Sequence, residues 1–353
     1  MEQKNKKYWF LYPKSEKEYV KVWKWKISSR LGGFLGIIAI ILCIAAMVKL
    51  KAAEQGYGLR SEYNYDSIFL KLISGNTKIR AEAGYIAYEG DVDAGRATGI
   101  GTLYGRDGNT IYSGEFEDNE YSGIGKLYGE NEMILYEGEF RHNLYEGTGS
   151  EYGTGGTVIY QGMFSRGKRN GKGILFDDSS NPVYEGNFLN GDIVYKDFLG
   201  KTTEAVGNMY TGKRDIYYDT EYFIVDMKDI GAMYSGSMSG TGLDDKMLVD
   251  KVFIKAESCI IGGKSVSGIE EVKETAGDLI YEGSVNINTE EAVVLSQLSA
   301  LEVNPIYDDA LEITGYDKDK LLYIYSFQWE KLQYTFYSES ANGKFIMYSI
   351  EQL

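Results

Sequence analysis

The chain has 353 residues and a formal net charge of −15, and it contains 43 glycines and 31 tyrosines but only 3 prolines. This composition is typical of a turn-rich β protein with two or three structural parts. Residues 1–51 hold 11 Lys or Arg and 3 Asp or Glu, whereas residues 52–353 hold 26 and 49. Because phosphate backbones are bound by basic surfaces, the acidic balance of the larger part excludes a nucleic-acid partner.

The first expected elements are a basic cytoplasmic tail, residues 1–30, and a transmembrane helix, residues 31–50. The stretch from Leu31 to Val48 carries no charged residue. A helix of this length is about 27 Å long, close to the roughly 30 Å of a bilayer core. The cationic residues gather before the run, so the positive-inside rule predicts a single-pass protein of the cell membrane with its C-terminal domains extracytoplasmic.

Other features of this region concern assembly and export. Gly32 and Gly36 form a small-xxx-small pair, which is compatible with a homodimer. Cys43 lies inside the run and Cys259 is the only other cysteine, a usage typical of a bacterial exported protein without disulfides. A cleaved signal peptide is the competing interpretation, but the 30 residues before the run are long for its basic part.

Residues 52–87 are expected to form a linker with a short helix, and a repeat begins at residue 88. A Tyr-x-Gly fragment, in most copies followed by x-Phe, returns every 24 residues. The residues with this structural role are Tyr88, Gly90, Tyr112, Gly114, Phe116, Tyr136, Gly138, Phe140, Tyr160, Gly162, Phe164, Tyr184, Gly186 and Phe188. Paired glycines, from Gly99/Gly101 to Gly171/Gly173, keep the same step. Such a period indicates an array of stacked supersecondary units.

Each unit is predicted to be a β-hairpin. Tyr112, Gly114 and Phe116 share one strand parity, which is the alternation of a half-buried strand. The turns are predicted at a column of residues that accept positive φ, namely Gly95, Asn119, Asn143, Gly167 and Gly191. We expect aromatic rings of one hairpin to lie over the glycines of the next.

The second strand of each unit has two candidate buried columns. One is aromatic and consists of Tyr104, Tyr128, Tyr152 and Phe176, and the other consists of Leu103, Leu127, Glu151 and Leu175. Because a buried glutamate would be costly, Glu151 favours the aromatic column as the buried one.

Over residues 88–195 this pattern resembles the MORN (membrane occupation and recognition nexus) repeat. The resemblance implies an elongated, twisted antiparallel ribbon that serves recognition or assembly and has no activity of its own. Val92 stands in the first unit where the others have phenylalanine, as in a capping repeat. Residues 196–245 are expected to be a degenerate repeat or connector, with weak echoes of Tyr-x-Gly at Tyr210 and Tyr234 and another at Tyr281. Of these echoes, the stretch 234–242 is the candidate degenerate unit.

Residues 246–353 are expected to form a small α+β domain. Strands are predicted over 222–227, 251–256, 321–329, 333–338 and 344–350, and short helices over 269–277 and 291–301. Asn342-Gly343 between the last two strands predicts a terminal hairpin. Residues 250–353 are similar to the β-lactamase-inhibitor-protein-like α+β module, which implies a binding role.

No residue is predicted to be catalytic, to bind a cofactor or to ligate a metal. His142 is the only histidine and lies in a predicted turn, so a histidine-dependent triad or a multi-histidine zinc site is hard to build. Adjacent acids such as Asp177-Asp178, Asp244-Asp245 and Asp308-Asp309 are expected to be solvated loop residues. Calcium on one of these loops stays open, although none has the spacing of an EF-hand.

The sequence therefore predicts a membrane-anchored, non-enzymatic scaffold that binds a protein partner or the cell envelope through its repeats. The candidate binding face consists of the strand positions of exposed parity, which are Glu115, Glu137, Glu139, Gln161 and Glu185. The alternative is a cell-wall glycan binder or a carbohydrate-active enzyme, in which tyrosine rings would stack on sugars. The direction of the tyrosine side chains distinguishes the two hypotheses.

Overall fold

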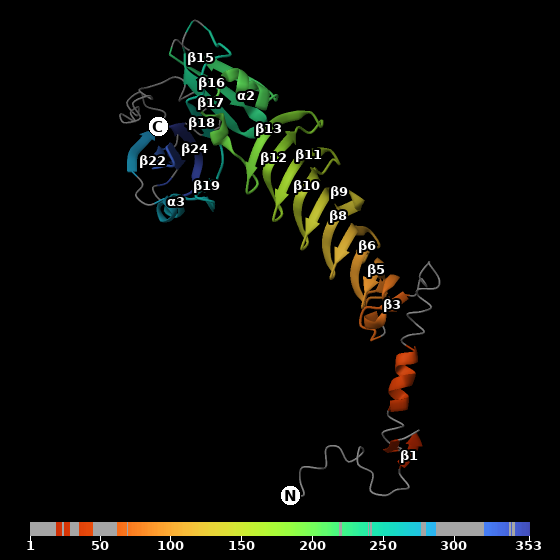
Figure 1. Cartoon of the computed structure of the whole chain (residues 1–353). Helices are drawn as coiled ribbons and strands as arrows, with labels where there is room; N and C mark the ends of the chain where they lie inside the picture. The colour runs from red at the N-terminus through yellow and green to blue at the C-terminus, as the bar shows by residue number, and fades with distance from the viewer. Residues whose placement is uncertain are drawn as a thin grey trace, which may run out of the picture. The chain divides into compact units, whose positions relative to one another are not determined.

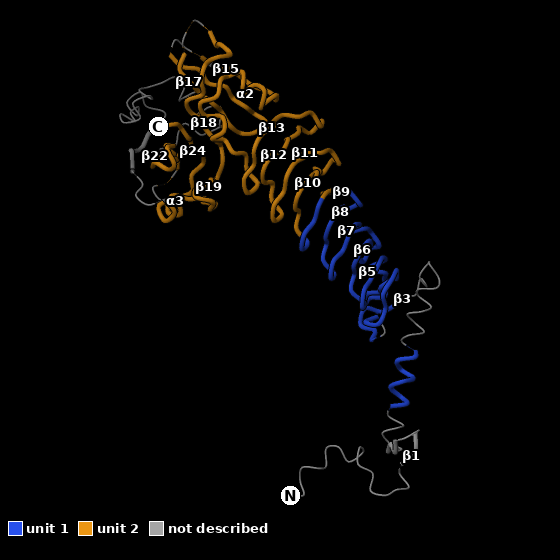
Figure 2. Tube along the Cα trace, viewed as in Figure 1, with its two compact units in different colours: residues 1–134, 139–143 blue, residues 135–138, 144–353 orange. Residues whose placement is uncertain are grey.

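The computed structural model describes residues 19–22, 25–28, 35–44, 62–68, 70–218, 221–238, 240, 242–276, 280–286, 321–338, 340 and 343–353. The chain divides into two compact units, residues 1–134 with 139–143 and residues 135–138 with 144–353 (Figure 2). Figure 1 shows that most of the described elements are β-strands.

The N-terminal region corrects one prediction. Strands β1 (Tyr19–Val22) and β2 (Trp25–Ser28) pair antiparallel, and residues 35–44 are helical. Among the described residues, no helix is both long enough and apolar enough to cross a membrane. The fold class with a transmembrane helix over residues 31–50 is therefore wrong for the described chain, and Gly32 of the expected dimer motif lies outside the described residues.

Six strands of the first unit lie in chain order. They are β3 (Glu62–Asn64), β4 (Gly75–Arg80), β5 (Ile86–Asp93), β6 (Arg96–Tyr104), β7 (Thr110–Glu117) and β8 (Glu120–Tyr128). β3 runs parallel to β4, and the following pairs are antiparallel. The 3-10 helices η3 (Leu70–Leu72) and η4 (Glu130–Glu132) lie between strands. The segment 52–87, expected to be a linker, thus contributes two strands and η3.

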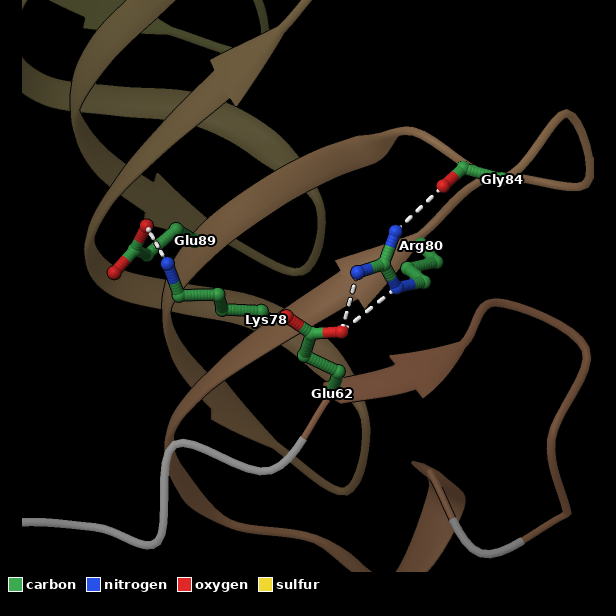
Figure 3. A network of polar contacts seen from close by, with 5 residues as sticks. All are labelled: Glu62, Lys78, Arg80, Gly84 and Glu89. Atoms are coloured by element: carbon green, nitrogen blue, oxygen red, sulfur yellow. Dashed lines mark hydrogen bonds and ion pairs between the residues drawn. The ribbon is translucent and has the colours of Figure 1, made fainter.

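Charged side chains link β3 to β4 and β4 to the first repeat (Figure 3). Arg80 donates from Nε and Nη2 to Oε2 of Glu62, at 2.8 and 2.5 Å, and from Nη1 to the carbonyl oxygen of Gly84 at 2.6 Å. Lys78 Nζ lies 2.8 Å from Glu89 Oε2 on β5. The two guanidinium nitrogens converge on one carboxylate oxygen, and the short strand β3 covers the edge that β4 would otherwise expose.

The repeats continue through β9 (Ile134–Arg141), which contributes residues to both units. The second unit then contains β10 (Leu144–Tyr152), β11 (Val158–Ser165), β12 (Lys168–Phe176), β13 (Pro182–Leu189) and β14 (Asp192–Ile193). β10 to β14 pair antiparallel with their chain neighbours. After β14 come the 3-10 helix η5 (Tyr195–Phe198) and helix α2 (Thr203–Met209), whose N-terminus is capped by the Thr202 hydroxyl.

The second unit also holds an eight-stranded sheet of order β15-β16-β17-β18-β24-β23-β22-β21. Its strands are β15 (Arg214–Tyr218), β16 (Tyr222–Met227), β17 (Ala232–Ser237), β18 (Lys251–Ile254), β21 (Ile280–Asn286), β22 (Leu321–Trp329), β23 (Leu332–Ser338) and β24 (Phe345–Gln352). The 3-10 helix η6 (Lys228–Ile230) joins β16 to β17, and β19 (Cys259–Ile261) and β20 (Lys264–Val266) form a hairpin. β15 to β17 come from the segment 196–245, so this sheet begins before residue 246.

Several predicted elements of this part are confirmed. They include the strands over 222–227 and 321–329, the terminal hairpin of β23 and β24, and helix α3 (Ile269–Ala276). The backbone N–H and hydroxyl of Ser267 both donate to Glu271 Oε2, at 2.6 and 3.1 Å, which stabilises the start of α3. The helix predicted over 291–301 lies outside the described residues.

One of the weak Tyr-x-Gly copies, the one at Tyr210, keeps the geometry of the repeats. Tyr210 forms an antiparallel bridge with Tyr184, and its hydroxyl donates to the carbonyl oxygen of Lys213 at 2.6 Å. A Cβ on Gly212 would meet the Tyr210 hydroxyl at 2.6 Å. At the echo that we favoured from the sequence, Gly236 instead faces the Phe223 ring. The degenerate tyrosine-on-glycine contact therefore lies at 210–212.

Candidate binding face of the repeat sheet

One face of the repeat sheet is closed by its tyrosines. Tyr88, Tyr112, Tyr136, Tyr160 and Tyr184 are each at most 4% exposed. Three of them donate from the hydroxyl to the carbonyl oxygen three residues later, at 2.7 Å for Tyr88, 2.9 Å for Tyr112 and 3.0 Å for Tyr160. We call this side of the sheet the tyrosine face. Its rings point into the protein, which leaves them unable to stack on a sugar.

The tyrosine rings lie over the glycine pairs of their own hairpin. A Cβ on Gly125 would lie 2.5 Å from Cζ of Tyr112, and one on Gly173 would lie 2.5 Å from Cζ of Tyr160. This corrects the expectation that rings cover the glycines of the next hairpin. The ring extends along its own strand, where Gly114 is two residues away on the same face and pairs with Gly125.

Contacts between successive hairpins are made by tyrosine and phenylalanine instead. Tyr88, Tyr112, Tyr136 and Tyr160 each meet the phenylalanine of the following repeat edge to face. The ring centroids are 5.2 Å apart for Tyr88 and Phe116 and 4.9 Å apart for Tyr160 and Phe188. An edge-to-face pair contributes about 0.5–1.5 kcal/mol beyond the area that it buries. Repetition of this pair makes the tyrosine face a continuous aromatic core within each unit.

A third repeat column was missed in the sequence. Tyr121 stacks on Tyr112 with centroids 3.9 Å apart, and Tyr145 stacks on Tyr136 at 3.8 Å. Arg169 takes the equivalent place in the next repeat, 4.8 Å from the centroid of Tyr160, and donates to Glu151 Oε2 at 2.8 Å. The 24-residue step from Tyr121 to Tyr145 could have identified the column, but the change to arginine obscures it. An arginine fits because its guanidinium stacks on aromatic rings.

Neither candidate column of the second strand is fully buried. Leu103 pairs with Tyr88 and Tyr112, and Leu175 pairs with Tyr160 and Tyr184. Directly paired residues of an antiparallel sheet point to the same side, so the leucine column and Glu151 lie on the tyrosine face. The leucine column, Glu151 and the aromatic column that we expected to be buried are all half-buried. Glu151 is tolerated because Arg169 neutralises it.

The turns join each hairpin to the one before it. Asn143 has φ 65°, and its N–H donates to the carbonyl oxygen of Tyr121 at 3.2 Å. The N–H of Tyr121 in turn donates to Asn143 Oδ1 at 2.8 Å. Asn119 makes the same two bonds with Ala97, at 3.0 and 2.8 Å. His142 lies on the same turn as Asn143, exposed, with Nδ1 2.7 Å from Glu120 Oε2.

We expect the repeats to lose stability in alkali. Burial raises the pKa of Tyr160 from 10.0 to about 12, and it raises the pKa of Tyr88 and Tyr112 as well. Between about pH 10 and pH 12 the unfolded chain releases tyrosine protons that the folded chain keeps. The stability of the fold is therefore full below about pH 10 and falls as the pH rises towards 12. Urea midpoints followed by circular dichroism should show this fall, and Tyr160→Phe should make it shallower. A constant midpoint up to about pH 12 would contradict the assignment.

The opposite face of the sheet carries the predicted binding residues. Glu115, Gln161 and Glu185 are exposed, whereas Glu137 and Glu139 are half-buried. Glu115 Oε1 accepts from the N–H of Ile124 at 3.1 Å, and Glu137 Oε2 accepts from the Tyr152 hydroxyl at 3.4 Å. These carboxylates are partly used within the sheet, so they do not form one free acidic surface.

Exposed apolar residues on this face were also missed. Ile100 and Ile124 occupy equivalent positions of successive repeats and are 69% and 60% exposed. Ile100 pairs with Glu115, which places it on the side opposite the tyrosine face. Their 24-residue step is visible in the sequence, but Thr148 and Lys172 continue the column and remove its apolar character.

The second unit contains a groove of about 910 Å³ on the same face. It is lined by β11, β12 and β13 and by residues of η5 and α2 and the link between them. Gln161 and Glu185, two of the predicted binding residues, line it, and no aromatic residue does. The groove therefore lacks the ring platform that a glycan site would use.

In two of the acidic loops an aspartate accepts hydrogen bonds from backbone N–H groups of the same loop. Asp177 Oδ1 accepts from the N–H of Ser179 at 2.9 Å and of Asn181 at 2.8 Å. The bonds from Asn181 are the main reason that the pKa of Asp177 is lowered. Asp244 accepts from the N–H of Lys246 at 3.1 Å. Within the described residues no group of three or more potential ligands could hold a metal ion, and Asp308-Asp309 lies outside them.

Comparison with known families agrees with the repeat geometry. The MORN repeat model matches residues 88–110, 112–133, 136–158 and 160–180. No curated protein matches the chain, and the likeness of residues 250–353 to a β-lactamase-inhibitor-protein-like module finds no support. Strand β13 extends the tyrosine face beyond the last match, through Tyr184. Residues 88–180 of the chain thus contain four MORN repeats.

Proposed function

We propose that the chain is a non-enzymatic scaffold that binds a protein partner through the face of the repeat sheet opposite the tyrosines. The observation that carries this proposal is the exposure of Ile100 and Ile124 at 69% and 60%, in register on a sheet. Apolar side chains displayed in a row on a rigid array are typical of the binding surfaces of repeat proteins. MORN repeats generally bind proteins or membranes.

The reactive residues favour binding over catalysis. His142 lies on an exposed turn, with Nδ1 2.7 Å from Glu120 Oε2. Burial raises the pKa of the Cys259 thiol to about 12, so this residue is protonated at neutral pH and is a poor nucleophile. Neither residue lines the groove.

Photo-crosslinking in cells that make the protein tests this proposal. A photoreactive amino acid is placed at Ile100, at Ile124 or, as a control, at Arg106, which is exposed in the loop between β6 and β7. We expect the two isoleucine positions to be joined to the same discrete protein and the Arg106 position not to be joined to it. Crosslinks from Arg106 alone would overturn the proposal, as would turnover of a glycan or peptide by the purified chain.

A further inference from the structure

The floor of the groove in the second unit is bare backbone. Gly162 pairs with Gly173, and Gly173 pairs with Gly186, so three glycines lie side by side across β11, β12 and β13. Their other side is covered by the rings of Tyr160 and Tyr184. At these three positions a side chain would point to the tyrosine face, so what they present to the groove is backbone, which a ligand backbone can approach between the neighbouring side chains.

The groove is lined by three lysines, whereas the protein as a whole is acidic. Lys172 on β12, Lys196 on η5 and Lys201 between η5 and α2 all line it. In the described part of the chain, no carboxylate forms an ion pair with any of these three lysines. Of the two acids in the lining, Asp197 accepts from Asn187 Nδ2 at 2.7 Å. Glu185 is the other acid. In an otherwise acidic protein this concentration of unpaired cations favours an anionic ligand.

The other side chains of the groove indicate which anion fits. No arginine lines the groove, so the forked contact that selects phosphate is absent. Gln161 and Asn208 supply amide groups, which both donate and accept, as a peptide backbone requires. Leu199 and Met209 add a small apolar wall, and methionine adapts to side chains of different shape.

We propose that this groove binds an extended acidic peptide segment of the protein partner, with the peptide backbone over the glycine floor and its carboxylates against Lys172, Lys196 and Lys201. The inference rests on the proposed function, because it names the part of a protein partner that the scaffold recognises. It also assigns a role to Glu185, which lowers the affinity for acidic segments by like-charge repulsion.

Fluorescence anisotropy of a labelled peptide of alternating glutamate and leucine, titrated with the full chain, tests the inference. The groove variant combines Lys172→Gln, Lys196→Gln and Lys201→Gln. The matched control combines Lys168→Gln, Lys246→Gln and Lys264→Gln, which are exposed lysines outside the groove lining. We expect the groove variant to weaken binding by about tenfold or more and the control to change it by less than about twofold.

A gain of affinity separates the inference from misfolding. Glu185→Gln should tighten binding of the acidic peptide, which a damaged fold cannot do, and the glutamine counterpart of the peptide should not bind. Equal weakening by both triple variants would overturn the inference, as would binding of inorganic phosphate or phosphatidylserine vesicles without binding of the peptide. If crosslinking at Ile100 and Ile124 succeeds while the peptide fails, the groove inference falls and the scaffold proposal stands.

Discussion

Replacement of Gly138 by alanine is expected to destabilise the repeats strongly. A Cβ at this position would lie 2.5 Å from the Cα of Gly149, 2.5 Å from the carbonyl oxygen of Thr148 and 2.7 Å from the Tyr136 hydroxyl. The first two are backbone atoms, which cannot move without breaking the sheet. We therefore expect a loss of roughly 2–3 kcal/mol and a fall of the melting temperature by about 5–10 °C. Gly138→Val should cost more.

Gly155 provides the matched control for this substitution. It lies in the loop between β10 and β11, and no heavy atom is within 4 Å of a Cβ built on it. Gly155→Ala should leave the melting temperature, followed by circular dichroism, nearly unchanged. If Gly138→Ala and Gly155→Ala had the same melting temperature, the close packing of tyrosine on paired glycines would not be what stabilises the sheet.

Replacement of Tyr160 by alanine is expected to have the largest effect of a single side chain. Tyr160 is 0% exposed and contacts the rings of Phe164 and Phe188, with centroids 5.1 and 4.9 Å away. Arg169 lies 4.8 Å from its centroid, so the cavity would also leave this cation without its ring. The loss should be roughly 3–5 kcal/mol, as for other buried aromatic side chains.

The substitution Tyr160→Phe keeps the ring and removes the hydroxyl, so it measures the contribution of the hydroxyl alone. It removes only the bond to the carbonyl oxygen of Met163 and should cost about 1 kcal/mol. Tyr218→Ala is the exposed control, because this tyrosine of the same unit is 57% exposed. Urea unfolding should rank the three variants in this order: Tyr160→Ala, Tyr160→Phe, Tyr218→Ala. A similar cost for Tyr160→Ala and Tyr218→Ala would contradict an aromatic core in the repeats.

The hydrophobic run at the N-terminus shows how composition can mislead. The run from Leu31 to Val48 has no charge, and hydropathy alone predicts a spanning helix. Hydropathy measures how apolar a segment is and does not by itself establish a continuous helix across it. Among the described residues, the helix in this region covers residues 35–44, and no helix is long and apolar enough to cross a membrane.

The sequence by itself determined the repeats and their turns. The 24-residue step, the shared parity of Tyr112, Gly114 and Phe116, and the turn position of Asn143 are local properties, because strand alternation and positive φ depend on neighbouring residues. The parity also separated the two faces of the sheet correctly for Gln161 and Glu185.

Only the tertiary structure decided which ring covers which glycine and where the groove lies. Leu103 rather than Tyr104 shares the tyrosine face because pairing register, not composition, sets the side of a strand residue. The groove needs Lys172 from the sheet together with Lys196 and Lys201 from the segment that follows it. Lys172 continues the column of Ile100 and Ile124, but Lys196 and Lys201 lie beyond the repeat strands. A surface formed by residues from different elements has no period that a sequence can display.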